Sequence, residues 1–393
     1  MPKTGRRTFF IAGAGISGLT LALALAKFGA NVTVLERNAS VSEFGAGLQI
    51  SPNARRVLDR LGLDEAITAN SLEPTGIDLY PPRAKRPLVT LELGAIMRER
   101  FGAPYAVMHR ADLAEVLHKA TRRFANIDIL YGTHSWDAVA SAHGIALAVE
   151  DASGQIRSLR GDALIGADGV HSKTRTTLVG GPPATWRGRV AWRTLLPFDA
   201  LASHIALDRV SVLFAANYHI VCYPLPHRQQ VNIALFAAAA SRDELPDQGA
   251  PRLPRRLPAR ARAILSAAGQ SWTPWPLYTV DTPVWHQGNI GLIGDAAHAM
   301  VPFQAQGAAM GIEDAAVLAP LLIEEPSAEA AFTKFEQIRR PRVEQVARVS
   351  QANGRIFHLR LPLSLGRNLV IAAQGSRGHL KRLAWLYGHD AQP

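Results

Sequence analysis

The spacing of apolar positions changes once within the first forty residues, and this change predicts a strand, a tight turn and a helix. Residues 8–12, Thr-Phe-Phe-Ile-Ala, form a short apolar strand. The glycine-rich segment 13–18 follows, and a helical run then continues to Lys27, with Gly29 as its stop. Residues 31–36, Asn-Val-Thr-Val-Leu-Glu, have the composition of a second strand. This order is typical of a nucleotide-binding α/β fold.

Two later apolar strands each end in a glycine and an aspartate. Residues 163–166 lead into Asp168-Gly169, and residues 288–293 lead into Gly294-Asp295. Gln306-Gly307 then opens a helical stretch that continues to Leu318. A short polar side chain at such a strand end, facing a helix start, can hold a polyol and favour an anion.

The middle of the chain has the alternation of a β-sheet. Three segments alternate or nearly alternate apolar and polar side chains, namely residues 189–196, 209–214 and 230–236. The turn-prone Asn217 precedes a fourth strand that carries His219 and Tyr223 at even spacing. Because alternate residues of a strand share a face, we expect these two side chains on the same face. Trp272, Trp275 and Trp285 are expected to pack between the lobes.

The C-terminal part is predicted to be helical. Pro326 and Ser327 start a helix that places Phe332, Phe335 and Ile338 on one face. Pro341 is expected to kink or end this helix, because a proline ring clashes with the preceding turn.

Composition narrows the class of protein. The 393 residues are 48% hydrophobic and 19% charged, which is enough apolar material for a large core or two fused lobes. The net charge of +11 comes from scattered arginines, and the densest basic stretches, 252–262 and 339–342, contain prolines and lack stacking aromatics. We therefore expect no nucleic-acid partner. A solvated basic face, or a positive electrostatic field that attracts acidic substrates, explains the surplus of basic residues.

Cysteine content and the N-terminus bear on the compartment. The single Cys222 excludes a disulfide framework, which suits a reducing compartment. The uncharged run 9–26 has the length of a signal peptide or membrane span, but three glycines interrupt it where a strand should turn into a helix. We expect a cytoplasmic protein with no stable membrane association.

The glycine segment has the spacing of a dinucleotide cradle. Gly13 permits a tight turn, Gly15 lets the backbone approach a pyrophosphate, and Gly18 allows close packing of helix and strand. Glu36, at the end of the second strand, can accept hydrogen bonds from an adenosine ribose. These residues alone leave both FAD and NAD open.

Three motifs in order, residues 13–18, 168–175 and 294–298, resemble the class A flavoprotein monooxygenases, which include salicylate hydroxylase, 3-hydroxybenzoate 6-hydroxylase and 6-hydroxynicotinate 3-monooxygenase. The resemblance spans nearly the whole chain and implies FAD as cofactor, with NADH or NADPH as a transient co-substrate. It implies an α/β fold with a Rossmann-like FAD-binding domain, an inserted mixed or antiparallel β-sheet substrate domain, and C-terminal helices. The implied FAD-binding domain comprises residues 1–75, 100–180 and 285–325, the substrate lobe 76–99 and 181–284, and the helical region 326–393.

The resemblance also implies roles for individual residues around FAD. Glu36 would bind the adenosine ribose, Asp295 the ribityl chain, and Asp168 would support both flavin binding and reduction by NAD(P)H. Arg110 and the segment 45–50 would lie beside the flavin. The expected cofactor contacts are Gly13, Ala14, Gly15, Ser17, Gly18, Glu36, Arg37, Gln49, Arg110, Asp168, Asp295, Gly307 and Ala308.

The implied reaction is hydroxylation of a phenolic or hydroxylated aromatic acid by O2 through a flavin hydroperoxide, in a monomer or homodimer. His219 would be the general base that deprotonates the ring hydroxyl, Tyr223 a phenol-binding donor, and Gln306 the third catalytic residue. His219 and Tyr223 could instead be ordinary packed residues of the sheet, and the ring could be a hydroxypyridine, a purine or another non-benzoate ring.

Three positions depart from the pattern of the resembling family. Ala305 and Ala309 stand where many relatives have Gly and Asn around the Gln-Gly pair, so the loop offers fewer side-chain donors. Gln49 stands where hydroxynicotinate hydroxylases carry a His, which disfavours a pyridine ring as substrate.

Overall fold

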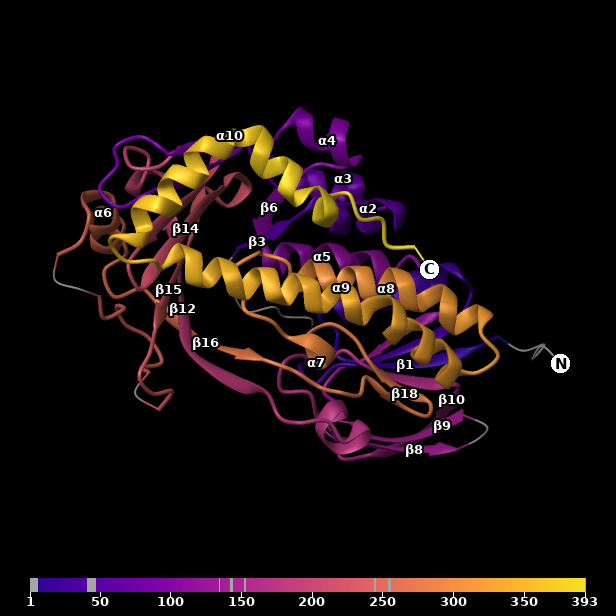
Figure 1. Cartoon of the computed structure of the whole chain (residues 1–393). Coiled ribbons are helices and arrows are strands. Elements are labelled where there is room, and N and C mark those ends of the chain that lie inside the picture. Colours follow the sequence, from indigo (N-terminus) through magenta and orange to yellow (C-terminus); the bar gives the residue numbers. More distant parts are fainter. Residues whose placement is uncertain are drawn as a thin grey trace.

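Two large β-sheets and the helices that cover them organise the chain (Figure 1). The computed structural model describes residues 6–40, 47–133, 135–141, 144–151, 153–243, 245–253 and 256–392. The first and last described residues lie toward the same side of the molecule in this view.

The six-stranded sheet has the order β17-β18-β11-β1-β2-β7. Its strands pair in parallel except for β17 at one edge. They are β1 (Thr8–Ala12), β2 (Asn31–Leu35), β7 (Ile127–Leu130), β11 (Ala163–Gly166), β17 (His286–Gln287) and β18 (Ile290–Leu292). Helix α1 (Ile16–Lys27) joins β1 to β2, and Gly29 follows it at φ +82°. The predicted N-terminal strand, helix and strand are confirmed.

The seven-stranded sheet has the order β16-β12-β15-β14-β13-β4-β5. It is mixed, because β13 pairs in parallel with β4 while its other pairs are antiparallel. Its strands are β4 (Gly76–Tyr80), β5 (Val89–Glu92), β12 (Thr185–Pro197), β13 (Arg209–Ala215), β14 (Tyr218–Leu225), β15 (Gln230–Ala238) and β16 (Thr273–Thr279). The four alternating segments are strands, as predicted, and Asn217 makes the turn at φ +76°.

The two faces of this sheet pack against different parts of the chain. One face, which includes Ile220, Cys222 and Trp272, forms a core with α6 (Ala259–Ala268). We call the other face the inner face; its residues pack against Val301 and Phe303, in the segment that leads to α8 (Gly307–Glu324). Trp272 thus lies in the core beside α6, and Trp285 lies in the core that contains the six-stranded sheet. The expectation that all three tryptophans pack between lobes was wrong for these two.

The C-terminal region is helical, as predicted, but its first helix is longer than expected. Ser327 caps α9 (Ala328–Phe357), and the helix continues through Pro341 as one element that runs alongside α8 (Figure 1). Proline removes only one hydrogen bond, and the helix is packed on both sides of it, by the buried Phe332 and Phe335 before it and by the buried Val343 and Val346 after it. Ile338 is exposed rather than on the buried face. Helix α10 (Leu363–Tyr387) completes the region.

The remaining elements connect and cover the two sheets. Strands β8 (Ser135–Ser141), β9 (Gly144–Glu150) and β10 (Ile156–Gly161) form a small sheet, and β3 (Gly47–Ile50) pairs with β6 (Ala106–His109). The other helices are α2 (Pro52–Arg60), α3 (Asp64–Ala69), α4 (Ala95–Phe101), α5 (Arg110–Thr121), α7 (Asp295–His298), the π-helix η1 (Thr174–Val179) and the 3-10 turns η2 (Phe198–Ala200) and η3 (Pro226–Arg228).

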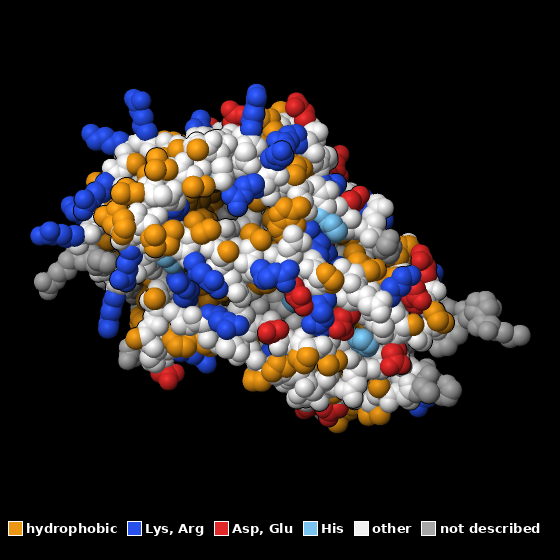
Figure 2. Space-filling view, in the orientation of Figure 1, with side chains coloured by type: hydrophobic (Ala, Val, Ile, Leu, Met, Phe, Trp, Pro, Cys, Tyr) orange, Lys and Arg blue, Asp and Glu red, His pale blue; other side chains and the backbone are white. Residues whose placement is uncertain are grey.

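The surface near α10 combines apolar and basic side chains. Figure 2 shows hydrophobic side chains gathered at the upper left with Lys and Arg among them, in the region that Figure 1 assigns to α10. Leu361, Leu363, Leu365, Leu369 and Val370 are exposed there. No helix in the described part of the chain is long and apolar enough to cross a bilayer.

Candidate functional site

The turn between β1 and α1 has the geometry that the glycine spacing predicts. Gly13 adopts φ +105°, and a Cβ there would lie 2.6 Å from the carbonyl oxygen of Ala167. A Cβ on Gly18 would collide with the carbonyl of Gly13, so helix and strand approach closely. No side chain caps α1 at Gly15, which leaves the N–H groups of its first turn directed at an incoming anion.

Glu36 lies at the end of β2 and holds this turn in place. One carboxylate oxygen accepts a hydrogen bond from the Ala14 N–H (3.0 Å) and the other from the Asn38 N–H (2.9 Å). Each oxygen keeps acceptor capacity for a ligand hydroxyl, because a carboxylate has about four lone-pair sites. Arg37 beside it is exposed. The Ser17 side chain instead faces Gly294 and Gly311, where added Cβ atoms would meet its hydroxyl.

Asp168 organises the turn that follows β11. Its carboxylate accepts hydrogen bonds from the Ser172 hydroxyl (2.5 Å) and from both the N–H and the hydroxyl of Thr174 (2.9 Å each). The buried Arg175 then donates to the carbonyl oxygens of Val170 and Ala296, at 2.8 Å each. Arg175, to which the sequence assigned no role, thereby ties the Asp168 turn to the Asp295 turn.

Asp295 is the first residue of α7, directly after Gly294, which adopts φ +59°. Its half-buried carboxylate makes no hydrogen bond or ion pair to any described residue. The neighbouring groups are fixed: the Gly294 N–H donates to Asp314 (2.9 Å), and His298 Nε2 lies 2.6 Å from the same carboxylate. A rigid backbone therefore presents an acceptor that no described residue pairs with, as a polyol-binding group requires.

The segment before α8 holds Gln306 in a buried, hydrogen-bonded position. The Gln306 amide accepts from Asn53 Nδ2 (3.1 Å) and donates to the Ser51 hydroxyl (2.9 Å), and the residue is buried. Gly307, the first residue of α8, has open space where a Cβ would stand, and Ala308 is half-buried beside it. No side chain caps this helix end, so its positive potential is available to an anionic group.

A buried charge cluster anchors α8 to α9. We define it as Glu313, Asp314, Arg339 and Arg342, and all four are at least nine-tenths buried as side chains. Arg339 donates to both carboxylates, at 2.6 and 2.8 Å, and Arg342 donates twice to Glu313 at 2.7 Å. Burial opposes ionisation of Asp314, but His298 and Arg339 outweigh it and lower its pKa to about 2. The sequence did not reveal this cluster.

Strand β3 lies next to the inner face of the seven-stranded sheet. Gly47 donates its N–H to Asn232 Oδ1 (2.7 Å), and a Cβ at Gly47 would collide with the Tyr223 ring. Gln49 accepts a hydrogen bond from the Tyr105 hydroxyl. Gly45 and Ala46 of the predicted flavin-side loop lie outside the described residues. Arg110 is half-buried at the start of α5.

His219 and Tyr223 lie on the inner face of β14, as their spacing predicts. His219 is 1% exposed and stacks on Phe236, with ring centroids 4.6 Å apart. The rings of Phe303 and Phe357 meet it edge to face, at 5.4 and 5.3 Å. His219 and Tyr223 are therefore both buried, and Phe303 brings the segment before α8 into contact with His219.

A hydrogen-bonded chain fixes the protons of His219. Arg189 Nη1 lies 2.8 Å from His358 Nδ1, and His358 Nε2 lies 2.8 Å from His219 Nδ1. A guanidinium can only donate, so His358 Nδ1 accepts and its Nε2–H donates to His219. Neutral His219 then carries its own proton on Nε2. Burial, then His358 and Arg189, lower the pKa of His219 well below its usual range.

Burial and the nearby Arg189 also lower the pKa of His358, to about 4. Both imidazoles are therefore neutral at pH 7. His358 gave no signal in the sequence, because it caps the C-terminal end of α9, 139 residues from its partner.

One further side chain of the inner face, Arg193, was missed by the sequence reasoning. Arg193 on β12 is paired in register with Ala234, which pairs with Val221 between the His219 and Tyr223 positions. Its guanidinium lies over the Trp275 ring, 5.8 Å from the centroid. The signal was available: a charged residue stands at an inward position of an alternating strand.

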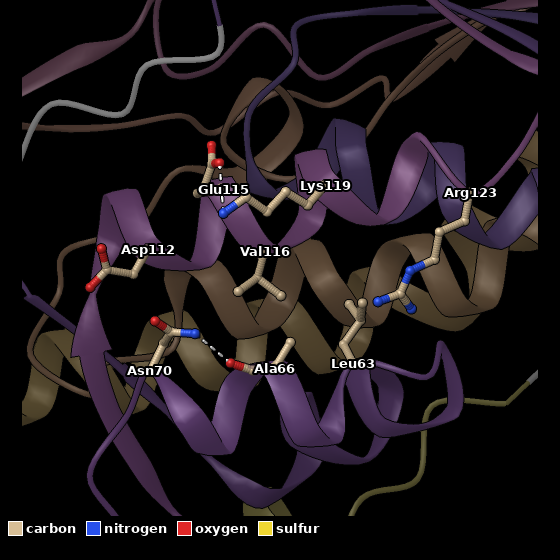
Figure 3. Close-up of a pocket in the computed structure, with 8 residues that line it drawn as sticks. All are labelled: Leu63, Ala66, Asn70, Asp112, Glu115, Val116, Lys119 and Arg123. Carbon is tan, nitrogen blue, oxygen red and sulfur yellow. Dashed lines mark hydrogen bonds and ion pairs between the residues drawn. The ribbon is translucent and has the colours of Figure 1, made fainter. Parts of the chain in front are cut away.

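Two surface hollows lie elsewhere. A cavity of about 170 Å³ opens between α3 and α5, and Figure 3 shows Val116 at its centre, with Lys119 paired to Glu115 (3.2 Å) and Asn70 bonded to the Ala66 carbonyl. The other, of about 330 Å³, lies beside Tyr80, Tyr218 and Arg260. Neither is lined by any predicted site residue, so they leave the candidate site at the strand ends unchanged.

The features at the strand ends fit a flavin dinucleotide. Two uncapped helix starts, α1 and α8, suit the pyrophosphate and the negative edge of a reduced flavin. Glu36 and Asp295, whose carboxylate pairs with no described residue, suit the two sugar chains. The class that the fold and this site define is a dinucleotide-dependent oxidoreductase with a second sheet above the redox site.

Comparison with known proteins gives the family. The FAD-binding domain family matches residues 7–350, and the chain belongs to it. The chain is 34% identical over 404 residues to 3-amino-4-hydroxybenzoate 2-monooxygenase of Streptomyces platensis, covering 100% of this chain and 98% of that one. It is 29% identical over 388 residues to 3-hydroxybenzoate 6-hydroxylase 1 of Aquipseudomonas alcaligenes, covering 97% of each.

A solved structure supports the fold. HpxO of Klebsiella pneumoniae, complexed with FAD and uric acid, superposes with a TM-score of 0.81 at 21% identity, covering 98% of this chain and 97% of that one. The predicted fold class, FAD as cofactor and an FAD-dependent aromatic monooxygenase are thereby confirmed.

Proposed function

We propose that this enzyme hydroxylates a phenolic aromatic acid of the hydroxybenzoate type, with NADH or NADPH and O2 as co-substrates. One observation carries the proposal: the inner face presents Arg189, Arg193 and His219 among aromatic rings, and His358 at the end of α9 bonds to two of them. No carboxylate of a described residue pairs with any of these four side chains. Such a face suits a flat, anionic, hydroxylated ring. The relatives named for aminohydroxybenzoate and hydroxybenzoate support the same substrate class.

The roles of the cofactor contacts follow from the cradle. Bound FAD would supply the redox chemistry, transferring reducing equivalents from the nicotinamide to O2 and the ring. Gly13, Ala14, Gly15 and Gly18 would hold its pyrophosphate against α1, and Glu36 and Asp295 its two sugar chains. Gly307 and Ala308 would place the start of α8 at the flavin ring, whose negative charge on reduction that helix end stabilises.

The remaining predicted contacts have supporting roles. Asp168 would act through the turn that it holds, and Gln306 through its bonds to Asn53 and Ser51. Gln49 and Arg110 would flank the flavin. Ser17 and Arg37 direct their side chains to α8 and to solvent, so their contact would be through the backbone.

His219 would bind the oxygen of the ring hydroxyl. The proton order set by Arg189 makes its Nε2–H a donor, which stabilises a phenolate and so raises the nucleophilicity of the ring. General-base action at the same nitrogen requires the two imidazoles to reverse their tautomers and to break the Arg189 contact. The Tyr223 hydroxyl would be a second donor, because burial raises its pKa and keeps it protonated.

One experiment tests the reaction itself. FAD-loaded protein is supplied with NADH or NADPH and O2, beside hydroxybenzoates, hydroxypyridines and purines, and products are analysed by mass spectrometry. We expect a product with one added oxygen from a hydroxybenzoate. A protein that takes up no FAD, or nicotinamide oxidation that yields only peroxide with each hydroxybenzoate, would contradict the proposal; turnover of a purine or hydroxypyridine alone would move it to that ring class.

Two substitutions separate the donor and base roles of His219. Glutamine can donate to a phenolate but cannot take up its proton, so His219→Gln should keep much of the hydroxylation rate that His219→Ala loses. Stopped-flow measurement of flavin reduction and of hydroxylation isolates the second step. Equal loss in both variants, with unchanged flavin reduction, would favour the general base instead.

A further inference from the structure

Arg193 is a half-buried cation with no anionic partner among the residues that the structure describes. Its Nε is buried and has no hydrogen-bond partner, and its guanidinium makes no hydrogen bond or ion pair to any residue in the described ranges. A guanidinium withdrawn from water without a compensating acceptor costs free energy, so such groups are normally paired. The buried charge cluster shows the usual arrangement, since Arg339 contacts two carboxylates there.

The position of Arg193 points it at the substrate side of the sheet. Its register partner Ala234 and the next residue across, Val221, are both inner-face residues, and His219 and Tyr223 flank Val221 on β14. Trp275 supplies a ring below the guanidinium, 5.8 Å from centroid to Cζ. A ring of this kind restricts the side chain and leaves the edge of the planar fork free for a ligand.

The surroundings favour an anion rather than a neutral ligand. Burial, with a smaller contribution from the cationic Arg110, lowers the pKa of Arg193, and the Tyr223 phenol opposes this. The positive charge of Arg193 therefore favours an anion, and no carboxylate of the described residues forms an ion pair with Arg193. A bidentate carboxylate would satisfy both the charge and the buried donor.

We propose that Arg193 binds the carboxylate of the aromatic substrate and thereby selects ring acids over neutral phenols. This rests on the proposed function and adds to it the subsite for the acid group. With the carboxylate on β12 and the ring hydroxyl at His219 on β14, the two strands would fix which edge of the ring faces the flavin. Arg193 thus determines specificity through binding, and no proton or electron passes through it.

The test compares acids with their neutral analogues on FAD-loaded protein. The ligands are salicylate, 3-hydroxybenzoate and 3-amino-4-hydroxybenzoate, each beside its carboxamide, and Kd is read from the change in flavin absorbance. Wild type should prefer an acid over its amide by about 100-fold, the usual consequence of losing one partner of a buried charge pair. Arg193→Met should weaken acid binding by about 100-fold and leave amide binding within about threefold. Arg193→Lys should fall between them.

A matched control lies on the same strand. Arg187 donates to the Thr279 hydroxyl (2.5 Å), so Arg187→Met removes the same charge from β12 without touching the proposed subsite and should keep the preference for acids. If Arg193→Met weakened the binding of acids and of amides equally, or left the binding of acids unchanged, the proposal would be overturned.

The same titrations distinguish two other outcomes. If the anion were the flavin itself, Arg193→Met would shift the reduction potential of the ligand-free enzyme and leave the preference for acids intact, which also overturns the subsite. If FAD-loaded wild type binds none of the acids, the proposed function fails together with the subsite.

Discussion

The buried charge cluster and the inner face of the seven-stranded sheet contain similar residues in opposite arrangements. In the cluster, Arg339 and Arg342 bond directly to Glu313 and Asp314. On the inner face, Arg189 donates to an imidazole, and Arg193 lies over the Trp275 ring with no hydrogen-bond or ion-pair partner among the described residues. The difference separates two uses of a buried cation. In the cluster, the arginine donors are satisfied by carboxylates of the protein, whereas on the inner face the donors of Arg193 stay free for a ligand.

A single segment joins these two regions. Residues 302–307 lead from the six-stranded sheet to α8, and Phe303 contacts His219 while Gln306 bonds to Asn53. Asn53 in turn donates to Glu313 of the cluster at 2.7 Å. The start of α8 is therefore held from one side by the hydrogen bonds of the charge cluster and touches His219 on the other side through Phe303.

Breaking the cluster should have the largest effect on stability. Arg339→Met leaves Glu313 and Asp314 buried with one cation fewer, which we expect to lower the free energy of unfolding by about 3 kcal/mol. Chemical denaturation at saturating FAD measures this change in the free energy of unfolding. The control is Arg348→Met on the same helix, whose exposed pair with Glu344 (3.7 Å) should change stability by less than about 0.5 kcal/mol.

A second variant keeps this prediction testable if Arg339→Met does not fold. Arg339→Lys retains the charge and loses the fork that reaches both carboxylates, so it should cost less than the methionine variant. A loss below about 1 kcal/mol in Arg339→Met would show that Arg342 and His298 neutralise the cluster unaided.

The contrast between the two regions also explains what the sequence could and could not predict. The cradle at Gly13 and the alternating strands follow from local rules, since a positive φ needs glycine and one sheet face needs apolar residues. The partners of His219 and of Arg339 could not be predicted, because each pairing joins a strand or helix to a segment distant in sequence. Arg193 lies between these cases. Its inward position follows from the alternation along its own strand, whereas the absence of a hydrogen-bond or ion-pair partner among the described residues depends on the tertiary structure.

Acid should destabilise the inner face. The pKa of His358 is about 4 in the folded protein against 6.5 for an unperturbed histidine, so the unfolded chain binds more protons between these values. The contribution of His358 to the free energy of unfolding is fully present above pH 6.5 and is lost as the pH drops toward 4, a loss of about 3 kcal/mol from this group. His219, whose pKa is also lowered, adds to the loss.

His358→Gln isolates this effect. Glutamine can accept from Arg189 and donate to His219, as the imidazole does, but it does not titrate. Denaturation curves at pH 7, 5.5 and 4.5 should show a shallower pH dependence for the variant than for wild type. Parallel curves would mean that folding leaves the pKa of His358 unchanged, so that His358 becomes protonated below about pH 6.5 and can no longer accept from Arg189 there.

The segment that joins the two regions carries the smallest predicted effect. Ala305 adopts φ +54°, a left-handed conformation that an alanine side chain disfavours. Ala305→Gly should relieve this strain and raise the free energy of unfolding by about 1 kcal/mol. Thermal unfolding of the FAD-loaded protein would show it as a small rise in Tm.

The same exchange four residues later should have the opposite sign. Ala309 lies in the first turn of α8 and is buried, so Ala309→Gly should cost about 1 kcal/mol of stability. If both variants lose stability, the positive φ of Ala305 is not strained, and packing around Phe303 decides the shape of the segment. If Ala305→Gly gains stability but slows hydroxylation, the strain serves to hold Phe303 against His219, and the two regions are coupled through the backbone.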